Sequence, residues 1–157
     1  QNLLHKKLLI IFRERQDNSI RFIEIIFHER NYQHLTGLEL TNTEGKILQH
    51  QSKNFYRKCI ENKLGLNDVD KVMGGVNFCL GLSRENDVFV PSSALLEDIK
   101  KLTSSPSQVL AIFEKDIDSE LYSTVKHVAK GLNLHHLILP PEISSKISLE
   151  HYVYRGK

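Results

Sequence analysis

Two strand-like segments that follow each other near the start of the sequence constrain the fold more than any other feature. Residues 7–14 and 20–28 are rich in Ile, Leu and Phe, and in the second run apolar residues recur at every second position. Such alternation places a row of apolar side chains on one face of an extended strand. The connecting residues 15–19, Arg-Gln-Asp-Asn-Ser, are polar and turn-forming. We therefore predict that the two segments form an antiparallel β-hairpin.

Four further segments favour strands. Residues 35–41 lead into the turn-forming sequence Asn-Thr-Glu-Gly, and residues 109–113 form a continuous apolar run that is typical of a central strand. Residues 134–139 read as a strand that two prolines end, and the apolar residues at 152–154 indicate one more. The sequence thus predicts a sheet that draws strands from both ends of the chain.

Three segments favour helices. In residues 52–64 and 121–132 apolar side chains recur three to four positions apart, and each segment ends near a glycine. Residues 92–102 follow a proline and begin with two serines, a pattern typical of a helix start. We therefore predict an α+β fold in which a mainly antiparallel sheet packs against two or three helices.

Length and composition place few limits on the partners of the chain. The 157 residues are 40% hydrophobic, which suits one domain over residues 1–157, and a net charge of +2 neither requires nor excludes a polyanion. The longest apolar run, residues 8–12, is too short for a membrane span, and the chain opens without a hydrophobic signal core. We expect a cytoplasmic protein with no membrane role. Cys59 and Cys79 are expected as buried thiols, with a single disulfide as the alternative.

The segment from Asn31 to Gly37 concentrates hydrogen-bonding side chains between two strand-like runs. His34 can act as a general acid or base because imidazole titrates near neutral pH. In an extended chain the hydroxyl of Thr36 projects to the same side. The alternative for His34 is a hydrogen-bonded structural histidine. The segment is a candidate active site.

The order of several segments resembles that of one nuclease family. The stretches that carry the resemblance are residues 22–27, the His34-Leu35-Thr36-Gly37 signature with its preceding Asn31-Tyr32-Gln33, and residues 55–59, 63–64, 75–82, 89–93, 95–99, 112–115 and 120–122. Together they are similar to the phage-type barnase-EndoU-colicin-RelE-like (BECR) nucleases, in the subfamily with the His-Leu-Thr-Gly signature. The chain departs from that pattern between Leu66 and Gly75, where the family carries a longer insert.

The resemblance implies a compact sheet that cleaves RNA without a metal ion or other cofactor, by attack of the ribose 2'-hydroxyl on the adjacent phosphate. It also implies a toxin-like protein associated with phages or mobile elements, with RNA and a cognate inhibitor or antitoxin protein as partners. The alternative is a non-catalytic RNA- or protein-binding module that retains the fold. No nucleotide-binding loop or serine-hydrolase elbow is present in the sequence.

The chemistry implied by the resemblance selects four candidate catalytic residues. RNA cleavage without metal needs a base, an acid and a cation or donors for the phosphorane. His34 fills the first or second role, Lys115 is expected to stabilise the phosphate, and Thr36 and Tyr122 are expected to donate hydrogen bonds. The alternatives are a solvated Lys115 and a half-buried Tyr122.

Four more residues are candidates for substrate binding. Ser92 and Ser93 would lie at the N-terminus of the helix predicted for residues 92–102, where they either cap the helix or bind a phosphate. Lys126 belongs to a basic face of the helix predicted for 121–132, which either contacts RNA or is a solvated charged face. Asn31 adjoins the His34 signature. The adjacent histidines 135 and 136 lack further ligands at metal-binding spacing, so we assign no metal site.

Overall fold

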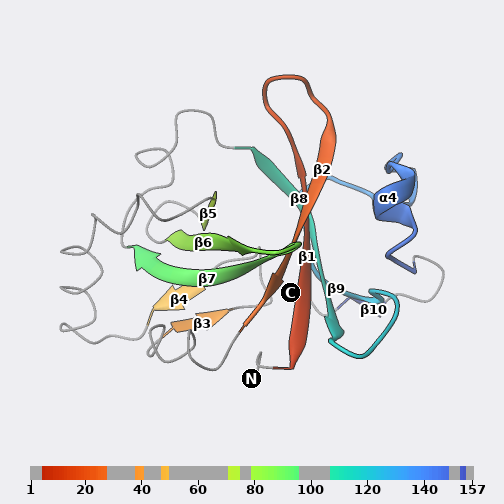
Figure 1. Ribbon diagram of the computed structural model, residues 1–157. Helices are drawn as coiled ribbons and strands as arrows, with labels where there is room; N and C mark the ends of the chain where they lie inside the picture. Colours follow the sequence, from red (N-terminus) through yellow and green to blue (C-terminus); the bar gives the residue numbers. More distant parts are fainter. Residues whose placement is uncertain are drawn as a thin grey trace.

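The computed structural model describes residues 5–27, 38–40, 47–49, 71–74, 79–95, 107–148 and 153–154. Ten strands lie in these residues: β1 (Lys6–Arg13), β2 (Ile20–Ile26), β3 (Leu38–Leu40), β4 (Ile47–Gln49), β5 (Lys71–Gly74), β6 (Cys79–Glu85), β7 (Val88–Leu95), β8 (Gln108–Asp116), β9 (Thr124–Val128) and β10 (Val153–Tyr154). Eight of them form one sheet in the order β10-β9-β8-β1-β2-β7-β6-β5, and β3 pairs only with β4 (Figure 1).

The predicted hairpin is confirmed by the pairing of β1 with β2. The two strands are antiparallel, in a register that runs from Lys7 opposite Ile26 to Arg13 opposite Ile20. Asn18 adopts a φ of 62°, a left-handed conformation that Asn tolerates better than most residues. The turn closes through two backbone hydrogen bonds, of 2.8 and 2.9 Å. Local sequence therefore determines this part of the fold.

Strand β8 occupies the central position that its apolar run predicted. It pairs antiparallel with β1 on one side and with β9 on the other. Residues 110–114 of β8 are all buried, as expected for a strand with neighbours on both edges and cover on both faces. Strands β3 and β10 lie within the segments 35–41 and 152–154 that predicted them.

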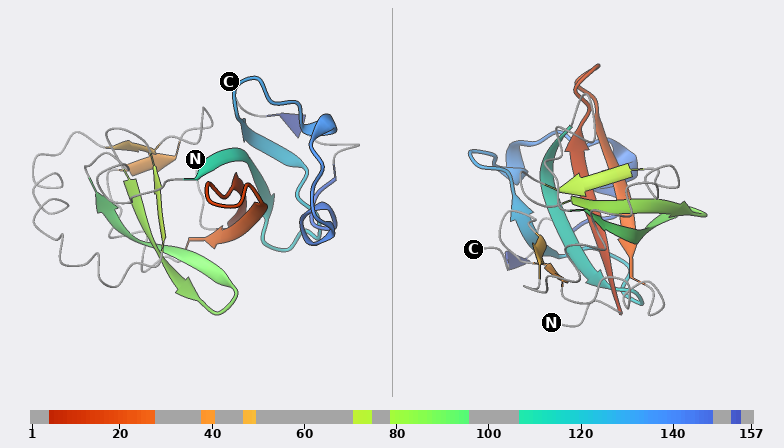
Figure 2. Two further views of the ribbon diagram at one scale, coloured as in Figure 1. Left: turned by 90° about the horizontal axis from the view of Figure 1, so that it is seen from above. Right: turned by 90° about the vertical axis from the view of Figure 1, so that its left-hand side faces the viewer.

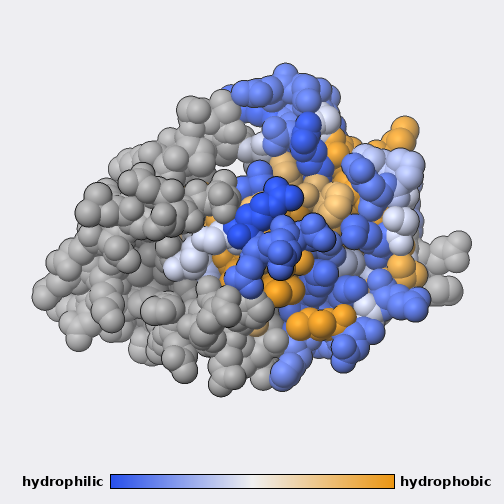
Figure 3. Space-filling view, viewed as in Figure 1, coloured by the Kyte–Doolittle hydropathy of each residue, from blue (hydrophilic) through white to orange (hydrophobic). Residues whose placement is uncertain are grey.

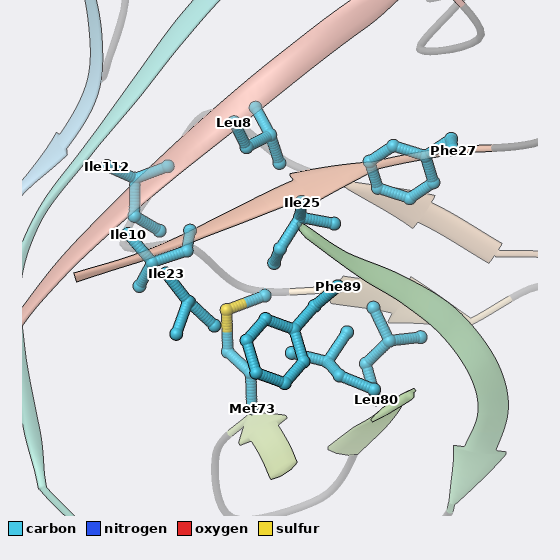
Figure 4. Packing of buried hydrophobic residues seen from close by; sticks show 10 residues of the cluster. Leu8, Ile10, Ile23, Ile25, Phe27, Met73, Leu80, Phe89 and Ile112 are labelled. Atoms are coloured by element: carbon cyan, nitrogen blue, oxygen red, sulfur yellow. The ribbon is translucent and has the colours of Figure 1, made fainter. Parts of the chain in front are cut away.

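The first face of the β1–β2 hairpin is covered by β5, β6 and β7, which belong to the same sheet. The sheet curls where β2 meets β7, because these two strands are parallel and share the single pair Ile25–Phe89. Side chains from both parts then pack together, as Figure 4 shows for Leu8, Ile10, Ile23, Ile25, Phe27, Met73, Leu80, Phe89 and Ile112. This is the first of two hydrophobic cores.

The second face is covered by the C-terminal part of the chain. Figure 2 shows this part on one side of the hairpin and β5–β7 on the other. Leu9, Ile11 and Phe113 of the sheet pack against residues that follow it, among them Leu134 of the 3-10 helix η3 (Leu134–His136) and Ile143 of the short helix α4 (Pro141–Ser144). The sheet therefore carries a core on each face.

The predicted α+β fold class is wrong, because the described residues are mostly strand. Their only helices are η3 and α4, of three and four residues. The segment 52–64 lies outside the described residues. No helix in the described segments has the length and apolar character needed to cross a membrane. Within this part of the chain, the sheet covers itself instead of packing against long helices.

The helix predicted for residues 121–132 is strand β9, and a β-bulge explains the error. Val125 pairs with Phe113 and His127 pairs with Ile112, so Lys126 is the extra residue on β9. The bulge lets Val125 and Val128, three positions apart, occupy the same face, where both contact the second core. Apolar spacing of three therefore imitated a helix.

The first four residues of the helix predicted for residues 92–102 belong instead to strand β7. Ser92 and Ser93 are strand residues, and the register of β7 against β6 shifts between Pro91 and Ser93. A proline is tolerated in a strand at such a bulge. Residues 134–139, predicted as a strand, instead contain η3, whose cap Asn133 accepts a hydrogen bond from the His135 backbone N–H.

Candidate functional site

One end of the sheet gathers charged side chains on the second face. Lys7 of β1 lies opposite Ile26 of β2 and opposite Lys115 of β8, and the rung two residues further along β1 places Leu9 opposite Glu24. Because alternate residues of a strand share a face, Lys7, Glu24 and Lys115 project to the same side. β1 begins at this end of the sheet, near the bottom of Figure 1.

Glu24 is the centre of this group. The Tyr122 hydroxyl donates a hydrogen bond of 2.8 Å to Oε2 of Glu24, and the Lys146 ammonium donates one of 3.3 Å to Oε1. The Lys7 ammonium lies 3.5 Å from Oε2. We call Lys7, Glu24, Lys115, Tyr122 and Lys146 the Glu24 cluster. Both carboxylate oxygens thus have charged or hydroxyl partners.

The segment after β8 brings Tyr122 and Lys146 to the cluster. Tyr122 forms an isolated parallel bridge with Ile147, in which its backbone N–H donates to the Lys146 carbonyl at 2.8 Å and its carbonyl accepts from Ser148 at 2.9 Å. The Lys146 N–H donates to the carbonyl of Ile143 in α4. A backbone link between distant segments therefore sets the position of two side chains in the cluster.

Lys115 is held beside Glu24 without an ion pair to it. Its ammonium donates a 2.6 Å hydrogen bond to the Ser119 carbonyl and lies 5.0 Å from the centre of the Tyr122 ring. Lys146 makes a similar contact with Phe22, at 5.4 Å from the ring centre. Cation–π contacts of this kind hold an ammonium group in place while leaving its charge unneutralised.

The cluster carries an excess of positive charge. Three lysines against one glutamate give +3 − 1 = +2. The side chains of Lys7 and Lys146 retain 23% and 36% of their exposure, whereas that of Glu24 retains 11%. Solvent therefore reaches the lysines from outside while the carboxylate stays largely covered.

The surroundings shift the pKa values of three groups in the cluster. Burial works to raise the pKa of Glu24, but the Tyr122 hydrogen bond together with Lys7 and Lys146 outweighs it, and the pKa lies below its ordinary value. Burial, and then the Glu24 carboxylate, raise the pKa of Tyr122. Burial, reinforced by the charge of Lys7, lowers the pKa of Lys115. Glu24 is therefore an anion at neutral pH and Tyr122 a neutral donor.

Two of the predicted site residues meet in the cluster and two others lie elsewhere. Lys115 and Tyr122 are in direct contact. The Ser92 hydroxyl lies 2.8 Å from the Ser83 hydroxyl in the β6–β7 hairpin. Lys126 lies 3.8 Å from Glu114, a residue that alternates with Phe113 and so faces the first core. His34, Thr36 and Asn31 lie outside the described residues, as does the Ser93 side chain, and their roles stay predictions.

Sequence reasoning missed Glu24, Lys7 and Lys146. Glu24 did leave a signal, because it is the one charged residue within the run Phe-Ile-Glu-Ile-Ile-Phe, and a charge in a buried strand requires partners. Lys7 and Lys146 carry no comparable local signal, since each resembles an ordinary solvated lysine. Among the described residues, no three His, Cys, Asp or Glu side chains are grouped so that they could hold a metal ion.

Comparison with known proteins relates the N-terminal part of the chain to nucleases. Residues 1–75 match the model of a family described as phage-Barnase-EndoU-ColicinE5/D-RelE like nuclease4. The match confirms the predicted relationship to the BECR-like nucleases and supports a nuclease-like function. It includes Lys7, Glu24 and the His34 segment, whereas Lys115, Tyr122 and Lys146 lie beyond it. No curated protein and no solved structure matches the chain.

Proposed function

We propose that the chain is a metal-independent endoribonuclease that cleaves RNA by attack of the 2'-hydroxyl on the adjacent phosphate. The observation that carries the proposal is the Glu24 cluster, in which two lysines pair with one carboxylate, a third lies over the Tyr122 ring, and a net charge of +2 remains at the sheet end. A phosphate that gains charge in the transition state is stabilised by fixed cations of this kind. The family match to nucleases supports the same reading.

The roles in this mechanism follow from the chemistry of each side chain. Lys115 and Lys7 would offset the charge of the phosphorane, and His34 would act as the general base or acid, with Thr36 as a donor. Tyr122 would act as a positioning residue, because its hydroxyl is already bonded to Glu24. Glu24 would hold the ammonium groups of Lys7 and Lys146 in place.

Chain connectivity is compatible with a role for His34 at this site. β2 ends at Ile26, which lies opposite Lys7, so the chain leaves the sheet at the end that carries the cluster. From Phe27 to His34 the chain advances seven residues, a reach of up to about 25 Å. Asn31 lies within the same stretch and is proposed to contact substrate, as are Ser92 and Ser93. Lys126 is not retained as a substrate contact, because it is buried against Glu114 on the first face of the sheet.

The proposal extends to the setting in which the protein acts. We expect one domain that is toxin-like, is associated with a phage or mobile element, acts on cellular RNA in the cytoplasm and has a cognate inhibitor protein. The inhibitor would have to cover the sheet end with acidic residues, since the exposed lysines there are cationic. Copurification with the product of a neighbouring gene would test this expectation.

The central test is cleavage of total RNA in the presence of a metal chelator. The expected result is cleavage by the unchanged protein that leaves 2',3'-cyclic phosphate ends, with a loss of about 10²-fold or more in H34A and K115Q. K130Q is a matched control, because Lys130 is an exposed lysine in the turn after β9. Cleavage that requires a divalent metal, or that is equal in all four proteins, would overturn the proposal.

A second function is favoured by one observation, the complete burial of Tyr122. Its hydroxyl and the Glu24 carboxylate satisfy each other, as they would in a structural network. A non-catalytic module that retains the fold would bind RNA or a protein through the exposed lysines. Salt-dependent RNA binding without any cleavage product would favour this second function over the first.

A further inference from the structure

The opposite end of the β1–β2 hairpin carries a polar hollow. It has a volume of about 320 Å³ and is lined by Arg13, Glu14, Arg15, Asn18 and Gln108. The hairpin tip stands at the top of Figure 1, and the same region of Figure 3 is mostly hydrophilic. With no apolar residue in its lining, the hollow does not suit a hydrophobic ligand.

Some side chains that line the hollow have hydrogen-bond donors that a ligand could use. The Glu14 carboxylate accepts a 3.3 Å hydrogen bond from the Ser107 hydroxyl, and one Arg13 nitrogen makes a long, 3.4 Å bond to the Asn18 carbonyl. Within the described residues, the side chains of Arg15 and Gln108 make no hydrogen bond or ion pair. Two arginines against one glutamate give +2 − 1 = +1. The hollow therefore offers guanidinium and amide donors to an anion.

We propose that this hollow, the Arg13–Arg15 subsite, binds a backbone phosphate of single-stranded RNA at a distance from the Glu24 cluster. The guanidinium group matches a phosphate with two parallel N–H donors, and a volume of about 320 Å³ has room for the phosphate and its sugar. The inference rests on RNA as the proposed substrate. It adds a positioning contact that carries no sequence information.

The spacing of the two sites defines the class of substrate. Arg13 and Lys7 lie on the same face of β1, six residues apart, which corresponds to about 20 Å along a strand. A mononucleotide has too few phosphates to fill both sites, whereas a polynucleotide can reach from one to the other. The protein is thus expected to prefer a long single strand to short fragments.

The test is equilibrium binding of a labelled twelve-nucleotide RNA to R13Q/R15Q over a range of salt concentrations, with His34 replaced by Ala in every protein to prevent turnover. Loss of one phosphate contact is expected to weaken binding and to reduce the slope of log affinity against log salt by about 0.7. R84Q is the matched control, because Arg84 is an exposed arginine in the other hairpin, beside the turn that joins β6 to β7.

A second measurement keeps the inference falsifiable if the double variant is poorly folded. Addition of inorganic phosphate to the unchanged protein should shift the NMR signals of the Arg13 and Arg15 side chains at lower concentration than that of Arg84. An unchanged salt slope in folded R13Q/R15Q, or equal shifts at all three arginines, would overturn the subsite. Both measurements are independent of cleavage. Absence of cleavage would contradict the proposed function, whereas the binding and NMR results alone decide whether the Arg13–Arg15 subsite exists.

Discussion

Glu24 and Glu114 are both buried glutamates of the central strands, but they lie on opposite faces of the sheet and are satisfied differently. Glu24 has a hydroxyl and two ammonium groups as partners, from three separate parts of the chain. Glu114 has only the Lys126 ammonium, 3.8 Å from its Oε2, and that oxygen makes no hydrogen bond within the described residues. One carboxylate is a network centre and the other is half of an isolated pair.

The difference indicates which of the two carboxylates belongs to a site that can bind a ligand. A buried ion pair contributes little net stability, because the loss of hydration offsets the attraction, although removal of one partner is costly. The Glu114–Lys126 pair fits that description, because its two side chains are only 8% and 10% exposed. The Glu24 cluster instead keeps Lys7 and Lys146 partly exposed and carries surplus charge. Of the two arrangements, only the Glu24 cluster can present cations to a ligand.

The largest effect on stability is expected from breaking the isolated pair. K126M leaves the Glu114 carboxylate buried without a counter-charge and should lower the free energy of unfolding by about 3–5 kcal/mol. Urea unfolding measures it. The double variant E114M/K126M is the control and should recover most of the loss, because an apolar pair of similar size needs no hydration. Equal stability of K126M and the unchanged protein would contradict the importance of the pair.

A smaller loss is expected when the network loses one of its three partners. Y122F removes the hydroxyl but retains the ring, so Glu24 keeps both lysines, and a hydrogen bond to a charged group contributes about 1.5–3 kcal/mol. Chemical denaturation of Y122F, E24Q and Y122F/E24Q, each compared with the unchanged protein, would measure the coupling between the two side chains. Strict additivity of the two substitutions would argue against the hydrogen bond.

The pH dependence of stability sharpens the comparison. The pKa of Glu24 in the folded state lies below the ordinary value of 4.5, so its contribution is complete above 4.5 and is lost as the pH falls through the folded value. As the pH is lowered below 4.5, the free energy of unfolding of E24Q should therefore fall less than that of the unchanged protein. Parallel acid-unfolding curves for the two proteins would show that Glu24 is not stabilised as an anion.

The smallest effect is expected for an ion pair of the same chemistry at the surface. Lys6 and Asp116 lie 2.5 Å apart, with side chains 33% and 65% exposed. D116N should change the free energy of unfolding by less than about 1 kcal/mol, because solvent already screens the pair. Thermal unfolding in low and high salt would measure it. A loss as large as that of K126M would remove burial as the explanation for the contrast.

The strands with strong local patterns were predictable from sequence, and those shaped by bulges were not. The β1–β2 hairpin and β8 follow from apolar alternation, a polar turn and a continuous apolar run. In β9 the bulge near Lys126 inserts one residue, which changes the apparent period and mimics a helix. In β7 a proline followed by two serines resembles a helix start but lies at a bulge of the strand. The sequence of one strand contains no information on its register with the partner strand, and this register decides where an extra residue forms a bulge.

The candidate site divides in the same way. Lys115 and Tyr122 were selected through the ordered family resemblance and do contact each other. Glu24 was visible as a charge within an apolar strand, but its partners were not. The bridge between Tyr122 and Ile147 places Lys146 at the carboxylate, across a sequence separation of 122 residues. No local pattern specifies a contact of that length.

The sequence by itself determined the hairpin, the central strand and the similarity of residues 1–75 to a nuclease family, because each depends on residues that are neighbours along the chain. Only the tertiary structure decided that the sheet curls over its own first face and that the C-terminal part closes the second. It also decided that Lys7 and Lys146 share the Glu24 carboxylate and that Lys115 lies beside Tyr122, since the sheet and the backbone bridge at Tyr122 fix which side chains meet.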